Sequence, residues 1–282
     1  EANRPISQKL KEKGLMFRQE TVEHSYPFCW RTDTPLIYKP ISTWFVKVES
    51  FRDRMVEHNR KVHWVPGHIR DGRFGKWLEN ARDWAISRNR FWGTPLPIWK
   101  SEDGDTLCFG SVEELENVSG TKVPDLHKQH VDQLVIEHQG KTYRRVTEVL
   151  DCWFESGSMP YGQQHYPFEN KEVFEANFPA NFICEGLDQT RGWFYTLVVI
   201  AQALFDKPAF HNCVVNGLIL AEDGKKMSKR LKNYPDPTEM LDQYGADAIR
   251  LYMLNSPAVR GEDLRFSEKG LVETTRTLLL LS

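Results

Sequence analysis

The clearest alternation of apolar and polar positions lies in the second half of the chain, where it predicts a strand, a helix and another strand. Residues 181–185 form a short apolar strand, residues 186–190 a polar turn, and residues 191–205 a helix that is apolar on almost every side. Such a helix must be covered over most of its surface. The apolar run 211–220 predicts the second strand, so the unit is typical of the parallel crossover in an α/β sheet.

Both predicted strands end in polar, glycine-containing loops. The first strand is followed by EGLDQ at residues 185–189, and the second by AEDGKKMSKR at residues 221–230. Ligands of open α/β sheets bind beyond the carboxyl ends of the strands. We therefore expect the two loops to face a single ligand.

Shorter elements are predicted in the first part of the chain. The segment 6–17 contains a short helix that ends at Gly14. Residues 36–48 suit paired extended segments because they combine β-branched and aromatic residues around a proline. Residues 74–82 are predicted to be helical, within a stretch rich in Arg, Lys, His and Trp.

Turn and capping signals locate three further elements. Asp103-Gly104 predicts a hairpin, and Ser111 with Glu114 forms a capping box that opens a short acidic helix. We interpret this middle region as an inserted accessory unit. Asp236 caps another helix, which has a proline at its first position. The predicted buried stripe of that helix consists of Met240, Leu241, Tyr244, Ala248, Leu251 and Tyr252.

Composition and charge narrow the class of protein. A chain of 282 residues with 40% apolar content is long enough to bury a core in one large or two modest domains. The 37 basic and 39 acidic residues give a net charge of -2, so any site for a polyanion must be local. The 5 cysteines are widely spaced and form no CxxC pair, which favours reduced thiols in a cytosolic or nuclear setting.

The two ends of the chain suggest a segment of a larger protein. The sequence begins without Met, and it ends in the apolar run 278–281. Its first residues are polar, and no apolar stretch approaches the roughly 20 residues that a membrane helix needs. We therefore expect neither a targeting signal nor a membrane anchor in it.

The densest positive cluster lies just after the second predicted strand. It consists of Lys225, Lys226, Lys229, Arg230 and Lys232. Charge alone favours a solvated basic loop or a nuclear-localisation-like run. The alternative is a mobile clamp for a triphosphate, because cations at a strand end can meet the charge that develops on a leaving pyrophosphate.

The string KMSKR at residues 226–230 resembles the KMSKS-type loop of class I aminoacyl-tRNA synthetases, with Arg230 in place of the final Ser. From about Ser25 to Arg265 the chain resembles the isoleucyl branch of that family. The segments that carry the resemblance are HSYPFCWRTDTP, WFVKV, DWAISRNRFWGTPLPIW, VLDCWFESGS, EGLDQTRGWF, the KMSKR loop and GADAIRLYML. Valyl and leucyl enzymes are the alternatives, and the DQTRGWF and WFESGS segments favour isoleucine.

The resemblance implies an α/β fold, namely the second half of a Rossmann-like nucleotide-binding fold with inserted connective α+β segments. It also implies four parts of the chain. These are the remnant of an inserted editing domain and its return linker at 1–38, connective segments at 39–150, the second half of the catalytic domain at 151–260, and the start of the stem and anticodon-binding helical domain at 261–282. The sequence contains neither a HIGH tetrapeptide nor a recognisable editing pocket.

The resemblance further implies an aminoacyl-adenylate site. Glu185 would face the α-ammonium group of the substrate. Gly186, Asp188 and Gln189 would hold the ribose and the aminoacyl end. Trp153 and Trp193 would wall the side-chain pocket, although core packing is the ordinary role of a tryptophan.

The ATP site implied by the resemblance has two parts. Gly217, Leu218 and Ile219 would offer the strand end whose backbone meets adenine. The loop residues Lys226, Met227, Ser228, Lys229 and Arg230 would approach the phosphates, with Lys226 and Lys229 as the catalytic pair. A separate element resembles a family hallmark near the tRNA acceptor end, where backbone contacts by arginine and structural stacking on tryptophan are equally good interpretations. It consists of Trp84, Ser87, Arg88, Arg90, Trp92 and Gly93.

The implied activity belongs to a cytoplasmic parent protein that uses isoleucine, ATP and tRNA(Ile), with Mg²⁺ carried by the ATP and no zinc held by this segment. Because such catalysis depends on positioning and charge compensation, we expect the isolated segment, which lacks HIGH, to be inactive. Two alternatives remain open. One is a non-catalytic fragment that binds RNA or serves as a scaffold, and the other is a nucleotidyltransferase of related fold.

Overall fold

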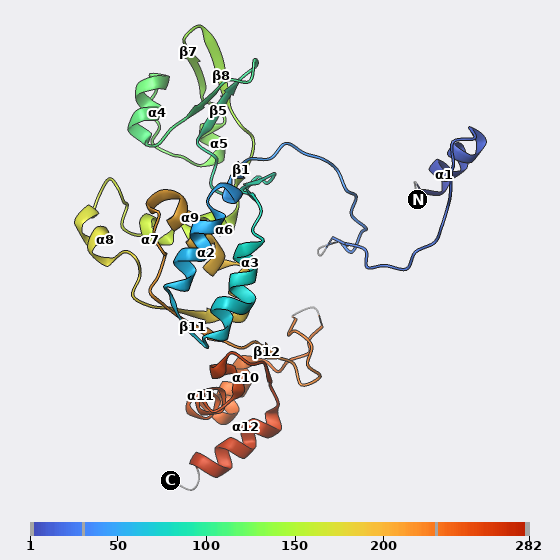
Figure 1. Ribbon diagram of the computed structural model, residues 1–282, viewed down its shortest axis with the longest axis vertical. Coiled ribbons are helices and arrows are strands. Elements are labelled where there is room, and N and C mark those ends of the chain that lie inside the picture. The colour runs from blue at the N-terminus through green and yellow to red at the C-terminus, as the bar shows by residue number, and fades with distance from the viewer. Residues whose placement is uncertain (1–2, 30–31, 229–230, 280–282) are drawn as a thin grey trace. The chain divides into compact units, whose positions relative to one another are not determined.

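The computed structural model describes residues 3–29, 32–228 and 231–279, which divide into two compact units at Ser42 and Thr43 (Figure 1). In the first unit, helix α1 spans Asn3–Glu12 and buries none of its residues. Gly14 follows with a φ of 65°, so the predicted helix and its glycine stop are confirmed.

A three-stranded parallel sheet forms the centre of the second unit. Its strands are β2 (His63–Val65), β10 (Ile183–Gly186) and β11 (Asn212–Asn216), in the order β10-β11-β2. Helix α9 (Trp193–Phe205) connects β10 to β11, so the predicted parallel crossover is confirmed. Strand β2 was not predicted, because its 3 residues are too few to show a period.

The core of this sheet joins segments that lie far apart in the sequence. Helix α2 (Arg52–Arg60) and helix α3 (Gly75–Glu79) pack beside each other, and α2 also contacts α9. At the centre, the buried ring of Trp64 in β2 contacts three aromatic rings, from η2, from α9 and from the segment before β11. Those rings are Phe74, Phe194 and Phe210, at centroid distances of 4.9, 5.7 and 5.9 Å.

The helix predicted at 74–82 is shorter than expected. A π-helical turn, η2 (Arg70–Phe74), runs directly into α3, which ends at Glu79. The paired extended segments predicted at 36–48 are largely wrong, since only β1 (Phe45–Val46) is a strand. It pairs with β3 (Trp84–Ala85), a partner too distant in sequence for a local pattern to indicate.

The single strand predicted at 211–220 is wrong, because the chain leaves the sheet at Gly217. Strand β11 ends at Asn216, and a separate strand, β12 (Ile219–Leu220), pairs in parallel with β13 (Leu264–Arg265). The Gly217 N–H donates to the carbonyl of Ala258, 2.7 Å away. This contact draws the chain out of the sheet, and it is invisible in the local pattern.

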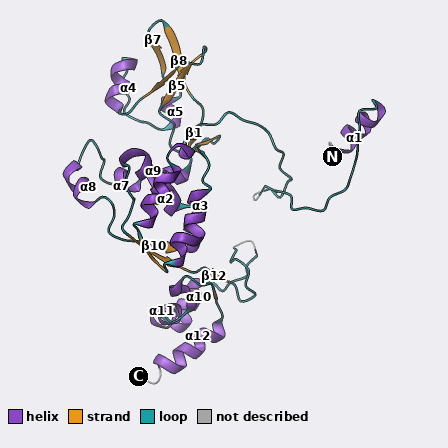
Figure 2. Ribbon diagram, viewed as in Figure 1, coloured by secondary structure: helices purple, strands orange, loops and turns teal. Residues whose placement is uncertain are grey.

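A four-stranded antiparallel sheet forms the accessory unit (Figure 2), with its own apolar core around Trp99, Ile136 and Tyr143. Its strands are β5 (Ile98–Ser101), β6 (Thr106–Cys108), β7 (Val135–His138) and β8 (Lys141–Arg145), in the order β6-β5-β8-β7. The predicted hairpin is confirmed as β5-β6. The capping box is confirmed too, since the Ser111 hydroxyl accepts from the Glu114 N–H at 3.0 Å, at the start of α4 (Val112–Ser119). A short helix, α5 (Lys128–Val131), completes the unit.

Three short helices follow the accessory unit, and an aromatic cluster holds two of them. Strand β4 (Ser87–Arg88) pairs with β9 (Val149–Leu150), which leads into the helices. The helices are α6 (Cys152–Gly157), α7 (Met159–Gly162) and α8 (Lys171–Asn177). The rings of Tyr161, Phe174 and Phe205 pack together and tie α7 and α8 to the end of α9.

The last part of the chain forms a small helical group. Its helices are α10 (Pro237–Tyr244), α11 (Ala246–Leu254) and α12 (Glu268–Thr274). The 3₁₀ turn η4 (Pro257–Arg260) lies between α11 and α12, and the π-helical turn η5 (Thr275–Leu279) follows α12. The Asp236 cap is confirmed, because its carboxylate accepts from the Thr238 N–H at 2.8 Å. The predicted stripe from Met240 to Tyr252 placed these residues on one helix. That prediction is wrong, since Gly245, with a φ of 80°, separates α10 from α11. Of the predicted stripe, Met240 and Ala248 are buried but Leu241 is exposed.

Within the described ranges, no helix combines the length and the apolar character that crossing a membrane would require.

The close approach at Gly217 gives a stability prediction. A β-carbon on Gly217 would lie 1.8 Å from the Glu262 carbonyl oxygen, so Gly217→Ala must displace backbone. We expect it to destabilise the fold by about 3 kcal/mol or more, measured by urea unfolding of the purified chain. Gly162→Ala is the matched control, because nothing lies within 4 Å of a β-carbon there. Equal midpoints for the two variants would contradict this.

The accessory unit gives a pH prediction. Hydrogen bonds from Lys141 and Ser101 lower the pKa of Asp103 to about 2, below the roughly 3.9 expected in an unfolded chain. The ionised carboxylate therefore adds stability above about pH 4, and this stability is lost as the pH falls toward 2. We expect Asp103→Asn to flatten the acid dependence of unfolding over that range, followed by near-UV circular dichroism. An unchanged slope would show that the Lys141 contact contributes nothing.

Candidate functional site

The candidate site lies at the carboxyl end of β10, where the chain turns into α9. Glu185 and Gly186 end the strand, and the 3₁₀ turn η3 (Leu187–Arg191) carries Asp188 and Gln189. A β-carbon on Gly186 would lie 2.8 Å from a carboxylate oxygen of Asp188, so glycine leaves room for that side chain. The predicted strand-end group is thus brought together at one corner of the sheet.

The side chain of Gln189 links Asp188 to the start of α9. Its amide nitrogen donates to Asp188 Oδ2 at 3.4 Å, and its oxygen accepts from the Trp193 N–H at 2.9 Å. The first N–H groups of a helix have no partner inside the helix. Gln189 therefore serves as a helix cap while it orients the exposed carboxylate of Asp188.

Trp153 and Trp193 reach the same turn because α6 packs closely against α9. Gly157 permits this approach, since a β-carbon there would lie 2.9 Å from Ile200 Cδ1. The indole N–H of Trp193 donates to the Ser156 carbonyl at 3.1 Å. A β-carbon on Gly192 would meet both the Trp153 ring, at 3.1 Å, and the Gln189 amide oxygen, at 2.7 Å. The apolar face of Trp153, which is 40% exposed, therefore adjoins the Gln189 amide of the turn.

Asp151 holds α6 in place, and the sequence analysis did not assign it a role. It is 3% exposed and caps the helix by accepting from the Trp153 N–H at 3.3 Å. Its other oxygen accepts from Arg88 Nη2 at 2.6 Å and from the indole N–H of Trp84 at 3.4 Å. An Asp directly before an apolar helix is a capping signal that could have been read from the sequence.

These contacts give a structural role to part of the element between Trp84 and Gly93 that resembles a family hallmark. Arg88 forms an ion pair with Asp151 and also donates to the carbonyl groups of Ala85 and Ser87, each at 2.8 Å. Ser87 is buried, and its hydroxyl accepts from the Trp44 N–H at 2.9 Å. Trp92, by contrast, is 74% exposed. The acceptor-end contact proposed for this element stays a prediction.

The basic loop follows β12, and not β11 as expected. Gly224, with a φ of 80°, forms a tight turn in which the Ala221 N–H donates to the Lys225 carbonyl at 2.9 Å. Lys226 then bridges back to Leu220 and is exposed. Lys229 and Arg230 lie outside the described residues.

Two contacts that the sequence analysis missed hold the start of the basic loop. The Asn233 amide donates to the Lys226 carbonyl at 3.1 Å and accepts from the Ser228 N–H at 2.9 Å. Between these two residues, Met227 packs against an apolar cluster with Met240 and Phe266. Met227 therefore anchors the loop through its side chain.

The backbone at Gly217 and Leu218 is already engaged. Besides the Gly217 contact described above, the Leu218 N–H donates to Asp263 Oδ1 at 3.1 Å. The close approach that Gly217 permits is to the backbone of Glu262. Ile219 packs against the cluster around Met240. The adenine contact implied for these residues stays a prediction.

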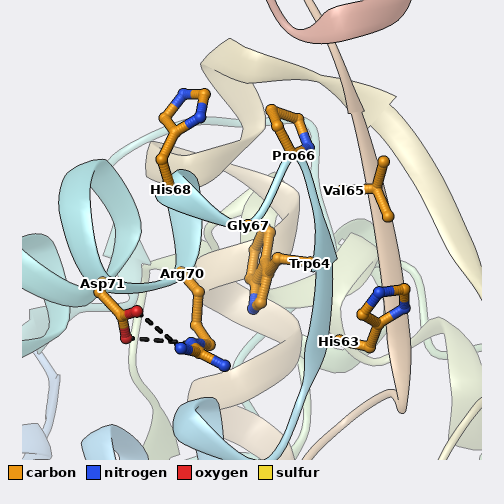
Figure 3. A pocket seen from close by; sticks show the side chains of 8 residues that line it. All are labelled: His63, Trp64, Val65, Pro66, Gly67, His68, Arg70 and Asp71. Carbon is orange, nitrogen blue, oxygen red and sulfur yellow. Dashed lines mark hydrogen bonds and ion pairs between the residues drawn. The ribbon is translucent and has the colours of Figure 1, made fainter.

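A hollow of about 620 Å³ lies beside β2 and the turn that follows it (Figure 3). It is lined by His63, Trp64, Val65, Pro66, Gly67, His68, Arg70 and Asp71. Figure 3 shows that the two imidazole rings and the Arg70–Asp71 ion pair do not meet at one point. We assign this hollow no chemistry. Across the part of the chain that the structure describes, no three His, Cys, Asp or Glu side chains are grouped to hold a metal.

Comparison with known proteins identifies the relatives of this chain. A family model described as tRNA synthetases class I (I, L, M and V) matches residues 2–266. Over 275 residues, 98% of this chain, it is 63% identical to the isoleucine–tRNA ligase of Chlamydia abortus and covers 26% of it. It is 61% identical to that of Protochlamydia amoebophila over 280 residues, which are 99% of this chain and 27% of the relative. The chain therefore spans about a quarter of the length of these relatives.

The fold has a counterpart among solved structures. A methionyl-tRNA synthetase of Mycobacterium tuberculosis in complex with methionyl-adenylate matches with a TM-score of 0.58 at 19% identity. The match covers 90% of this chain and 41% of that chain. It confirms the α/β fold class expected from the sequence, and at this identity it carries no argument about substrate.

The role of Asp151 gives a prediction that separates its two contacts. Asp151→Asn keeps an oxygen to cap α6 but loses the charge opposite Arg88, whereas Asp151→Ala loses both. Because Arg88 is partly exposed, we expect losses of only about 1 and about 2 kcal/mol in unfolding free energy, respectively. Urea unfolding measures the order. Equal losses for the two variants would show that the cap contributes nothing.

Proposed function

The chain belongs to the class I tRNA synthetases, and we propose that it forms the second half of the catalytic fold of an isoleucine–tRNA ligase. The identities of 61 to 63% with isoleucine–tRNA ligases support isoleucine over valine and leucine. The DQTRGWF segment at residues 188–194 supports the same choice. The parent protein would couple isoleucine to tRNA(Ile) at the expense of ATP.

The proposed reaction has two steps. The carboxylate of isoleucine attacks the α-phosphorus of ATP, the bond from that phosphorus to the α,β-bridging oxygen breaks, and pyrophosphate leaves with the electron pair of that bond. A hydroxyl of the terminal ribose of tRNA(Ile) then attacks the isoleucyl carbonyl and displaces AMP. No side chain becomes covalently attached, so the protein contributes positioning and charge compensation. Mg²⁺ would arrive with ATP and neutralise part of the phosphate charge.

The observation that carries the proposal is the meeting of polar and apolar groups around Gly192. There the Gln189 amide, which donates to the exposed carboxylate of Asp188, lies beside the Trp153 ring. An aminoacyl-adenylate needs both surfaces, since it combines ribose hydroxyl groups with an apolar side chain. Glu185 at the strand end would supply the charge opposite the α-ammonium group.

The basic loop would supply the opposite charge. Lys226 is exposed at the start of the loop, and with Lys229 it would approach the phosphates and meet charge on the departing pyrophosphate. The clasp by Asn233 and the anchor by Met227 support a fixed origin for the loop. Ser228 and Arg230 would complete this side of the site.

The segment alone would offer an incomplete site. Among the described residues, the outer edge of β10 pairs with no other strand, and the sequence contains no HIGH tetrapeptide. Without the side chains of the HIGH segment, the α-phosphate would lose part of its charge compensation. We therefore propose that the isolated segment does not catalyse adenylate formation.

Isoleucine-dependent exchange of pyrophosphate into ATP tests the proposal. We expect exchange with the parent protein and none with the isolated segment. In the parent, Asp188→Ala should lower kcat/KM for isoleucine by about 100-fold, because it removes a charged hydrogen-bond acceptor beside the adenylate. The matched control is Asp242→Ala, since Asp242 is an exposed carboxylate on α10.

Several outcomes would contradict the proposal. Exchange that depends on valine or leucine would replace isoleucine as the substrate, and robust exchange by the isolated segment would show that its half-site suffices. If the segment binds tRNA in an electrophoretic shift but no isoleucyl-adenylate analogue by calorimetry, the RNA-binding alternative is favoured.

A further inference from the structure

The turn that carries Asp188 and Gln189 is held from its outer side by a helix more than 100 residues earlier in the chain. We propose that Arg73, acting through Thr190, is a positioning residue that fixes this turn for adenylate formation. The proposal rests on the proposed function, because it assigns the turn its ligand. Arg73 lies on η2, and Trp77 follows it on α3.

The first contact joins Arg73 to the backbone of the turn. Arg73 Nε donates to the Thr190 hydroxyl at 3.0 Å, and that hydroxyl donates to the Leu187 carbonyl at 2.8 Å. Thr190 is fully buried. A hydroxyl has one proton to donate, and its lone pairs accept. The arginine, the hydroxyl and the carbonyl therefore form a chain that spans the turn from its last residues to its first.

The second contact fixes the next residue of the turn. The guanidinium carbon of Arg191 lies 4.9 Å from the centroid of the Trp77 ring, a cation–π arrangement. Trp77 also contacts Tyr195 of α9 edge to face, at 5.8 Å. Because residues four apart lie on the same face of a helix, Arg73 and Trp77 reach Thr190 and Arg191 from one face. Two successive residues of the turn are thus held from one side.

The geometry favours an effect on the site over an effect on overall stability. Arg73 is exposed, so its removal leaves no buried charge, and the buried Thr190 hydroxyl keeps its bond to the Leu187 carbonyl. The loss of one hydrogen bond to a partly exposed side chain costs only about 1 kcal/mol of folding free energy. Thr190, however, directly follows Gln189 in the turn. A displacement of about 1 Å in residues that position a substrate can lower a rate by about 100-fold. The loss should therefore appear in catalysis before it appears in unfolding.

The test uses the full-length parent protein and a double-mutant cycle. We expect Arg73→Ala and Thr190→Val each to lower kcat/KM for isoleucine in pyrophosphate exchange by about tenfold, with a melting temperature within about 2 °C of the wild type for Arg73→Ala. The double variant should be no worse than either single variant, because both break the same chain of hydrogen bonds. Thr190→Ser keeps the hydroxyl and should retain wild-type activity.

Arg70→Ala is the matched control. Arg70 lies on the same helix, is partly exposed, and pairs with Asp71 instead of the turn. We expect no change in kcat/KM from this variant. Equal losses from Arg70→Ala and Arg73→Ala, or losses from Arg73→Ala and Thr190→Val that multiply in the double variant, would overturn the proposal.

A readout independent of activity keeps this proposal separate from the proposed function. Arg73→Ala should speed amide hydrogen exchange in residues 187–193 by about tenfold, and Arg70→Ala should not. A wild-type parent without isoleucine-dependent exchange would contradict the proposed function alone. Unchanged hydrogen exchange in Arg73→Ala would contradict the positioning role alone.

Discussion

The packing of α9 against α6 and the parallel sheet is the constraint on which the site depends. Every residue of α9 from Phe194 to Gln202 is buried, so the helix cannot shift without exposing apolar surface. Gly157 lets α6 approach it closely. Because the site turn ends at the start of α9 and Trp153 lies on α6, one buried contact sets both the polar and the apolar wall of the site.

A second constraint comes from the shared core of segments 48–81 and 183–215. Trp64 at its centre ties β2 to the crossover, and the same early segment continues into the helix that bears Arg73. The early segment thus serves as more than a connection between domains. Because it shares this core, it brings Arg73 against Thr190 and Trp77 against Arg191 in the site turn. No residue near the turn in the sequence makes these two contacts.

What the sequence could predict follows from the range of each interaction. The β5-β6 hairpin and the caps at Ser111 and Asp236 depend on neighbours within a few residues, and all were predicted. The crossover was predicted as well, because the apolar pattern within each of its strands and its helix is itself local. The missed features depend on distant partners. Gly217 leaves the sheet because of Ala258 and Glu262, and β2 is a strand only because β11 lies beside it. The family resemblance supplied the candidate site residues. The Asp151 cap could have been read from the sequence, but its pairing with Arg88 and the contacts of Asn233 with the basic loop required coordinates.

The two sides of the proposed site are built differently, and the chemistry gives a reason. On the β10 side, the nitrogen and the oxygen of the Gln189 amide are both hydrogen-bonded, to Asp188 and to the Trp193 N–H. These bonds fix the Asp188 carboxylate before a ligand arrives. On the other side, Lys226 is exposed, and only its backbone is clasped by Asn233. Preorganised groups stabilise charge best where the ligand stays in place, as the aminoacyl and ribose groups do through both steps. In the proposed reaction pyrophosphate departs after the first step. A lysine held by its backbone alone would be able to follow the phosphates, while the turn would keep the adenylate in place.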